Sequence, residues 1–78
     1  MALSPEQCRA ARALLNWTRE QLAEASGVAL RALGDFETGA KTPRPSTLNK
    51  LTKALSEAGV ALVQIDGTAG GVALLRRE

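Results

Sequence analysis

Two glycines divide the middle of the chain into short segments with helical periodicity. Residues 21–39, QLAEASGVALRALGDFETG, contain two such segments, which meet at Gly27 and stop at Gly39. Glycine commonly ends a helix because it adopts the left-handed backbone conformation without a steric cost. The pattern therefore predicts two short helices joined by a tight turn, the second running over about residues 29–38.

The two helical segments that precede Gly27 each begin with a capping box. Ser4 is followed three residues later by Gln7, and Thr18 is followed in the same way by Gln21. In this arrangement the hydroxyl of the first residue and the side chain of the glutamine three positions later each accept a hydrogen bond from the other residue's backbone amide. We expect one helix to start directly after Ser4 and another directly after Thr18.

A further helix and a hairpin are predicted in the second half of the chain. Two prolines within residues 40–45 make that segment a loop, and the leucines that follow recur at helical spacing, which predicts a helix from about Pro45 to Ala58. Residues 60–65 and 72–77 are short apolar segments, and the six residues between them favour turns. They predict two strands of a β-hairpin.

The composition excludes several classes of function. The 78 residues suit one small domain and include a single cysteine, Cys8, and no histidine. No disulfide within the chain, Cys/His metal site or nucleophile–histidine pair can be assembled from them, so we expect no enzyme, no metal and no cofactor. Cys8 lies within a helical pattern and is interpreted as a small buried hydrophobe rather than a reactive thiol. The net charge of +2 is compatible with a nucleic-acid ligand.

The location of the protein is also suggested by what the sequence lacks. Its first residues do not combine a basic start with an apolar run, which is the pattern of a signal peptide. Its apolar runs are too short to span a bilayer. We expect a cytoplasmic protein that does not contact the membrane.

Several short motifs keep an order and spacing typical of one family of regulators. They are Leu22-Ala23-x-x-x-Gly27-Val28, Leu33, Glu37-x-Gly39, Pro43 and Thr47-Leu48-x-x-Leu51-x-x-Ala54-Leu55. Over about residues 5–58 the chain resembles the lambda-repressor-like, Cro-type helix-turn-helix DNA-binding regulators, also called the xenobiotic-response-element family. The tail from Gly59 resembles small bacterial members that append a hairpin. The resemblance implies a mainly α fold, with a four-helix DNA-binding domain over residues 1–58 and a β-hairpin tail over 59–78.

The resemblance also implies which residues contact bases. The second helix of the helix-turn-helix enters the major groove, and four of its residues are assigned to base contact: Leu30, Arg31, Gly34 and Asp35. Arg31 can donate two hydrogen bonds to guanine, and Leu30 offers apolar surface to a thymine methyl group. Gly34 lets the backbone approach the groove. Asp35 could accept from a cytosine amine or pair with Arg31 four residues earlier, and in the free protein we expect the ion pair.

Phosphate contacts are assigned to basic residues. Arg19 occupies the family position whose side chain contacts a phosphate or bridges to the recognition helix. Between Glu37 and Glu57 the chain has no acidic residue but four basic ones, Lys41, Arg44, Lys50 and Lys53. The first two adjoin the recognition helix and, with Thr42 between them, are assigned to phosphate contact. For the other two, phosphate contact and a solvated face stay equally open. The resemblance makes Glu37 structural, and Arg12 is its predicted partner.

The apolar tail favours a dimer. The residues assigned to dimerisation are Val60, Leu62, Val63, Ile65, Val72 and Leu74. A free two-stranded ribbon cannot bury so many apolar side chains, whereas pairing with a second copy would also satisfy its open edges. We expect a sequence-specific transcriptional regulator, a repressor, that binds a palindromic operator in double-stranded DNA as a homodimer. The alternative is an antitoxin or another protein-interaction module of the same fold, whose tail binds a partner protein.

Overall fold

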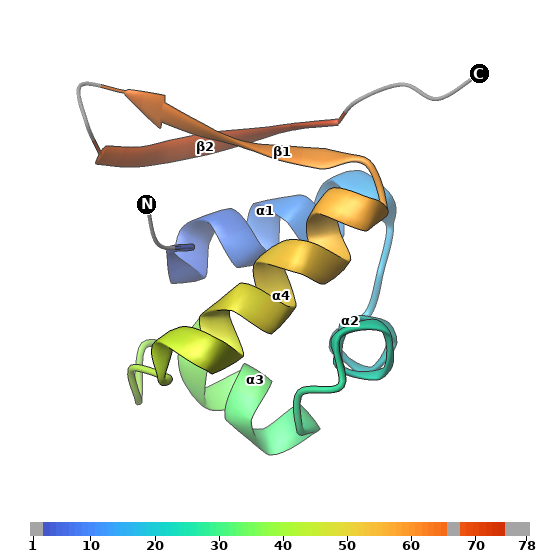
Figure 1. Cartoon of the computed structure of the whole chain (residues 1–78), viewed down its shortest axis with the longest axis vertical. Helices are drawn as coiled ribbons and strands as arrows, with labels where there is room; N and C mark the ends of the chain where they lie inside the picture. Colours follow the sequence, from blue (N-terminus) through green and yellow to red (C-terminus); the bar gives the residue numbers. More distant parts are fainter. Residues whose placement is uncertain (1–2, 66–67, 75–78) are drawn as a thin grey trace.

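The computed structural model describes residues 3–65 and 68–74 of the 78-residue chain. The described residues form four helices followed by a two-stranded antiparallel sheet (Figure 1). In chain order the elements are α1 (Pro5–Leu15), α2 (Arg19–Ser26), α3 (Leu30–Glu37), α4 (Pro45–Glu57), β1 (Val60–Ile65) and β2 (Thr68–Leu74). The mainly α fold with a C-terminal hairpin is therefore confirmed. No helix in the described ranges is long and apolar enough to cross a membrane.

The starts of α1 and α2 are set by the two capping boxes. The Ser4 hydroxyl accepts from the amide of Gln7 at 3.1 Å, and the Ser4 amide donates to Gln7 Oε1 at 3.0 Å. Thr18 and Gln21 make the same two bonds at 3.1 and 2.8 Å. Gly27 ends α2 in the left-handed conformation, with φ of 75°. These local signals explain why the turn between α2 and α3 lies where the sequence places it.

The core is aliphatic and lies between the four helices. Its fully buried leucines are Leu22, Leu33, Leu51 and Leu55, which come from α2, α3 and α4. Cys8 on α1 is also fully buried, as predicted, among these apolar side chains. Because α2 and α3 both contribute to this core, their relative orientation is fixed by packing as well as by the turn that joins them.

The hairpin lies across α1, on the side of the molecule opposite α3 (Figure 1). The register pairs Val63 with Gly71 and then Gln64 with Ala69, so one residue of β2, Gly70, is left without an opposite residue. This is a β-bulge, a position that tolerates glycine. The predicted second strand over 72–77 was wrong in its bounds, because β2 already begins at Thr68. Residues 66–67 and 75–78 lie outside the described part of the chain.

One face of the hairpin packs on the helices. Val60 is 2% exposed and belongs to the core, and Leu62 and Val72 pack against it. Gln7 on α1 also holds the sheet, because its Nε2 donates to the backbone oxygen of Gly71 at 2.9 Å. The hairpin is therefore part of the same packed unit as the helices.

The six residues assigned to dimerisation do not share one surface. Val60, Leu62 and Val72 face the chain's own helices, whereas Val63 is 37% and Leu74 50% exposed. The side chain of Ile65 lies outside the described part. Only part of the assigned set is therefore open to a second copy.

Candidate nucleic-acid interface

The helix α3 forms an exposed ridge. Leu33 and Phe36 point into the core, and this leaves Leu30, Arg31 and Ala32 exposed to solvent at the start of the helix. Leu30 is 44% exposed. No side chain caps α3 at Ala29. The first turn of α3 is thus apolar apart from Arg31.

Two hollows flank this ridge. One, of about 760 Å³, separates α3 from the start of α2 and is lined by residues that include Thr18, Arg19 and Gly34. The other, of about 340 Å³, lies on the side of the following loop and is lined by residues that include Lys41 and Pro43. Arg31 and Asp35 line both hollows, so they stand on the crest between them.

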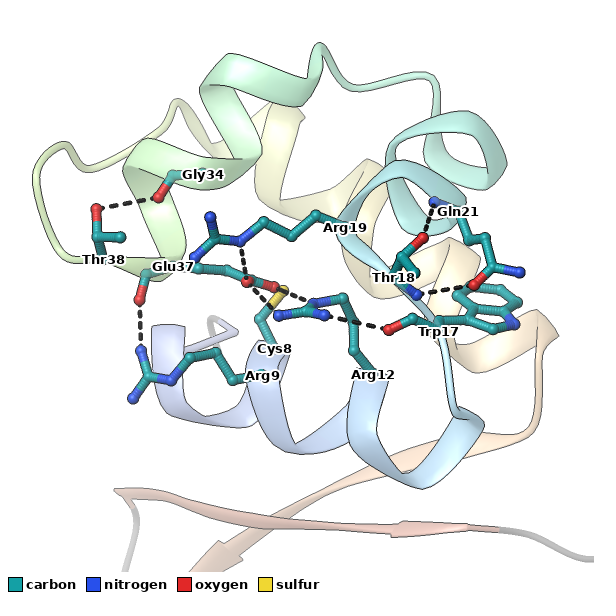
Figure 2. A network of polar contacts seen from close by, with 10 residues as sticks. All are labelled: Cys8, Arg9, Arg12, Trp17, Thr18, Arg19, Gln21, Gly34, Glu37 and Thr38. Carbon is teal, nitrogen blue, oxygen red and sulfur yellow. Dashed lines mark hydrogen bonds and ion pairs between the residues drawn. The ribbon is translucent and has the colours of Figure 1, made fainter.

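A buried carboxylate ties α3 to α1 and α2. Glu37 is 0% exposed, and its two oxygens accept from Arg12 Nε and Nη2, both at 2.7 Å (Figure 2). The predicted Arg12–Glu37 ion pair is therefore confirmed. Arg19 Nε donates to Oε1 at 2.9 Å, and Cys8 Sγ donates to Oε2 at 3.1 Å. The backbone oxygen of Glu37 accepts from Arg9.

The protonation states follow from this arrangement. Burial acts to raise the pKa of Glu37, but the hydrogen bonds from Arg12, Cys8 and Arg19 outweigh it and hold the pKa below its ordinary value. Burial, together with the neighbouring carboxylate, raises the pKa of the Cys8 thiol. Cys8 therefore keeps its proton and acts as a donor to an ionised Glu37. The bond to Glu37 outweighs burial and raises the pKa of Arg12.

Arg19 bridges from α2 to α3. Its Nη1 lies 3.7 Å from the place that a β-carbon on Gly34 would occupy. With its Nε bound to Glu37, the guanidinium lies along the surface of α3 and lines the larger hollow. Of the two roles that the resemblance implies for this position, the bridge to the recognition helix is formed in the free protein.

The predicted pair between Arg31 and Asp35 was wrong. The carboxylate of Asp35 lies 3.9 Å from Lys41 Nζ instead. The backbone oxygen of Asp35 accepts from the amides of Ala40 and Lys41, at 2.8 and 3.2 Å, which folds the loop back and brings Lys41 near. In the described part of the chain Arg31 has no ion-pair partner.

The other residues considered for phosphate contact lie in two places. Thr42 and Arg44 are exposed in the loop between α3 and α4, next to Lys41. Lys50 and Lys53 instead line a hollow of about 260 Å³ against the end of α2. This hollow shares no lining residue with the two beside α3.

Some residues of this surface were not found from the sequence. Thr18 and Thr38 line the larger hollow, and Pro43 lines the smaller one. Thr18 was identified only as a helix cap, and its place directly before Arg19 is the signal that could have placed it on this surface. The Thr38 hydroxyl donates to the backbone oxygen of Gly34 at 3.0 Å, a bond within one helix that no motif indicates.

Two short helices joined at a glycine turn, with the second exposed between basic flanks, have the arrangement of a helix-turn-helix module, a class in which the second helix is the one presented to DNA. The comparison with protein families supports the same class, because the helix-turn-helix family matches residues 9–57, more than half of the chain. The chain belongs to the lambda-repressor-like, Cro/C1-type helix-turn-helix family, a DNA-binding and non-enzymatic family. Membership implies DNA binding and transcriptional regulation. The comparison with curated proteins found no match.

Proposed function

We propose that the chain is a sequence-specific transcriptional repressor of the cytoplasm that binds a palindromic operator as a homodimer. The observation that carries the proposal is Arg31 on the crest of α3, which has no ion-pair partner among residues 3–65 and 68–74 and has a hollow on each side. A recognition helix in the major groove needs an exposed crest for the bases and flanking surfaces for the two phosphate backbones. This surface has both.

The residues divide between base reading and phosphate binding. Leu30, Arg31, Gly34 and Asp35 line the larger hollow and are proposed as the base-contacting set. Arg31 is its one cation and would read guanine, while Leu30 would cover a thymine methyl group. The proposed phosphate contacts are Arg19 on the α2 side and Lys41, Thr42 and Arg44 on the loop side. The exposed Lys41–Asp35 pair is no obstacle, because such pairs contribute little in water.

Substitution of two arginines tests this division. Arg31→Ala should cost about 1–3 kcal/mol at one base pair of each half-site and relax the preference there. Arg44→Ala should weaken binding to all duplexes about equally. The preferred sequence is first selected from random duplexes, and binding of both variants is then measured on matched and singly mismatched DNA. If both variants lose affinity evenly across these duplexes, Arg31 does not read a base.

We propose the outer face of the hairpin as the dimer interface. Side chains alternate across a strand, so the face opposite Leu62 carries Ala61 and Val63 from β1 and Ala73 from β2. This face is apolar, and Val63 on it is 37% exposed. Dimerisation matters because one module reads only a few base pairs, and two-fold symmetry doubles the site.

Val63→Glu should convert the dimer to a monomer, because it places a charge in the centre of this face. Sedimentation measures the state, and binding to the palindrome should weaken with it. Deleting the tail would be a poorer test, because it would also remove Val60 from the core. Leu30→Glu is the control for the oligomeric state, since Leu30 is 44% exposed at the start of α3 and should leave the dimer intact. Helix α3 lies on the side of the molecule opposite the hairpin (Figure 1). A Val63→Glu chain that still dimerises would favour the alternative, in which the tail binds a partner protein.

A further inference from the structure

We propose that Glu37 and Gly34 are positioning residues that present Arg19 as a preformed phosphate clamp beside the recognition helix. The proposal rests on the proposed DNA-binding function and adds to it how the contact is built. Arg19 is then more than a surface cation at the start of α2. Before DNA binds, the buried carboxylate of Glu37 already holds the Arg19 guanidinium, and the absence of a large side chain at Gly34 leaves space for it.

The first part of the argument is the fixed carboxylate. Glu37 accepts four hydrogen bonds, two from Arg12, one from Arg19 and one from Cys8. The side chain is fully buried, and three of these bonds involve a charged donor. Such bonds are shorter and stronger than neutral ones, so the carboxylate has little freedom to rotate. The direction in which Oε1 accepts from Arg19 Nε is therefore set by the fold (Figure 2).

The second part is the space over Gly34. A β-carbon there would lie 3.7 Å from Arg19 Nη1, which is ordinary van der Waals contact. A methyl group would therefore fit, whereas a longer side chain would need the volume that the guanidinium occupies. A small residue at this position therefore leaves room for the guanidinium of Arg19, and glycine or alanine would both meet that requirement.

The third part is what stays free on Arg19. Its Nε donates to Glu37. The two terminal nitrogens, Nη1 and Nη2, have no hydrogen-bond partner in the described part of the chain. The side chain is 41% exposed, and it lines the larger hollow beside Thr18. Two free N–H-bearing nitrogens in a planar fork match the geometry of a phosphate. Because the arginine is already ordered, little rotamer freedom is lost on binding.

Arg19→Lys is the main test, because it keeps the charge and removes the fork. The probe is a labelled, mixed-sequence DNA duplex of about 30 base pairs, long enough for two half-sites one helical turn apart. Binding should weaken about tenfold, since lysine can neither bond Glu37 through Nε nor present two more nitrogens to a phosphate. The control is Lys53→Arg, which also exchanges one cation for another but lies in the hollow against the end of α2, and it should bind within about twofold of the unchanged chain.

A second pair of variants tests the role of Gly34. Gly34→Ala should weaken binding less than Gly34→Leu does, because the methyl group fits against Arg19. Gly34→Leu should weaken binding by about the same factor as Arg19→Lys, because it displaces the guanidinium. In an Arg19→Ala background, Gly34→Leu should then weaken binding by a smaller factor than it does in the unchanged chain. Circular dichroism checks that each variant is folded. If Gly34→Leu does not fold, the Arg19→Lys result alone decides whether the clamp exists.

The outcomes separate the two proposals. Equal binding by the Arg19→Lys and Lys53→Arg chains overturns the clamp while DNA binding stands. An undiminished effect of Gly34→Leu without Arg19 also overturns it, because Gly34 would then serve something other than the arginine. No binding of the duplex by the unchanged chain overturns the proposed function and the clamp with it. A selective loss in Arg19→Lys, with non-additive Gly34→Leu, supports the clamp.

Discussion

Glu37→Leu is expected to lower the free energy of unfolding by about 3–5 kcal/mol. The leucine fills much of the volume of Glu37, but it leaves Arg12 and Cys8 without the acceptor that both now use. Arg12 is only 19% exposed in its side chain, so water replaces the lost bonds poorly. The measurement is urea denaturation at neutral pH, followed by circular dichroism. Glu24→Gln, at an exposed position on α2, is the control and should change little.

The pH dependence of stability tests the same carboxylate through its charge. The pKa of Glu37 in the folded chain is held below its ordinary value. The stability that the ionised form provides is therefore present above about pH 4.3, the pKa of an unfolded glutamate, and is lost as the pH falls through the lower folded pKa. Glu37→Gln lacks this contribution, so the difference in stability between the two chains should shrink in acid. A difference that stays constant down to about pH 2 would contradict the assignment.

The local features of this fold could be predicted from the sequence because their physics is local. A capping box needs only Ser4 and Gln7, or Thr18 and Gln21, at a spacing of three residues, and both boxes form. Gly27 ends α2 by adopting the left-handed conformation, which requires no contact with a distant residue. Such signals fix where helices begin and end before any tertiary contact is made. These local signals predict where α3 lies in the sequence, but they do not predict which residues pack around it.

Contacts between distant segments were found only where the family resemblance supplied them. It gave the pair of Arg12 and Glu37, which are 25 residues apart. It did not give the bond from Gln7 to the backbone of Gly71, 64 residues away, because a helix cap already accounts for that glutamine. Cys8 was expected to be buried as a small hydrophobe, but its bond to Glu37 depends on how α1 and α3 pack. A single sequence does not carry that packing.

Two local predictions failed for reasons outside their own segments. Asp35 and Arg31 have the spacing of a helical ion pair, but the loop folds back on the end of α3 and brings Lys41 to Asp35. The glycines near residue 70 have the composition of a turn, yet they continue β2 through a bulge. In both cases the local propensity was real, and a neighbouring strand or loop offered a better partner.

Binding to DNA is expected to fall about a thousandfold as the salt concentration rises from about 50 mM to about 200 mM. The reason is counterion release, since each phosphate neutralised by a cation steepens the dependence of log Kd on log salt by about 0.9. Three cations flank the crest of α3 in each subunit, namely Arg19, Lys41 and Arg44. A dimer would then contact about six phosphates with charged groups. Affinity is measured by fluorescence anisotropy on the selected palindrome over this range of salt.

The steepness of this dependence also reports the oligomeric state. A monomer with the same three cations would lose only about fortyfold over the same range, because its slope is half as large. Lys50→Gln and Lys53→Gln are the matched controls, since both lysines line a hollow apart from those beside α3 and should leave the slope unchanged. Lys41→Gln and Arg44→Gln should each reduce the salt slope by about 1.8, because each variant removes about two charged phosphate contacts from the dimer. Affinity that stays flat with salt would rule out this basic surface as the site of DNA binding.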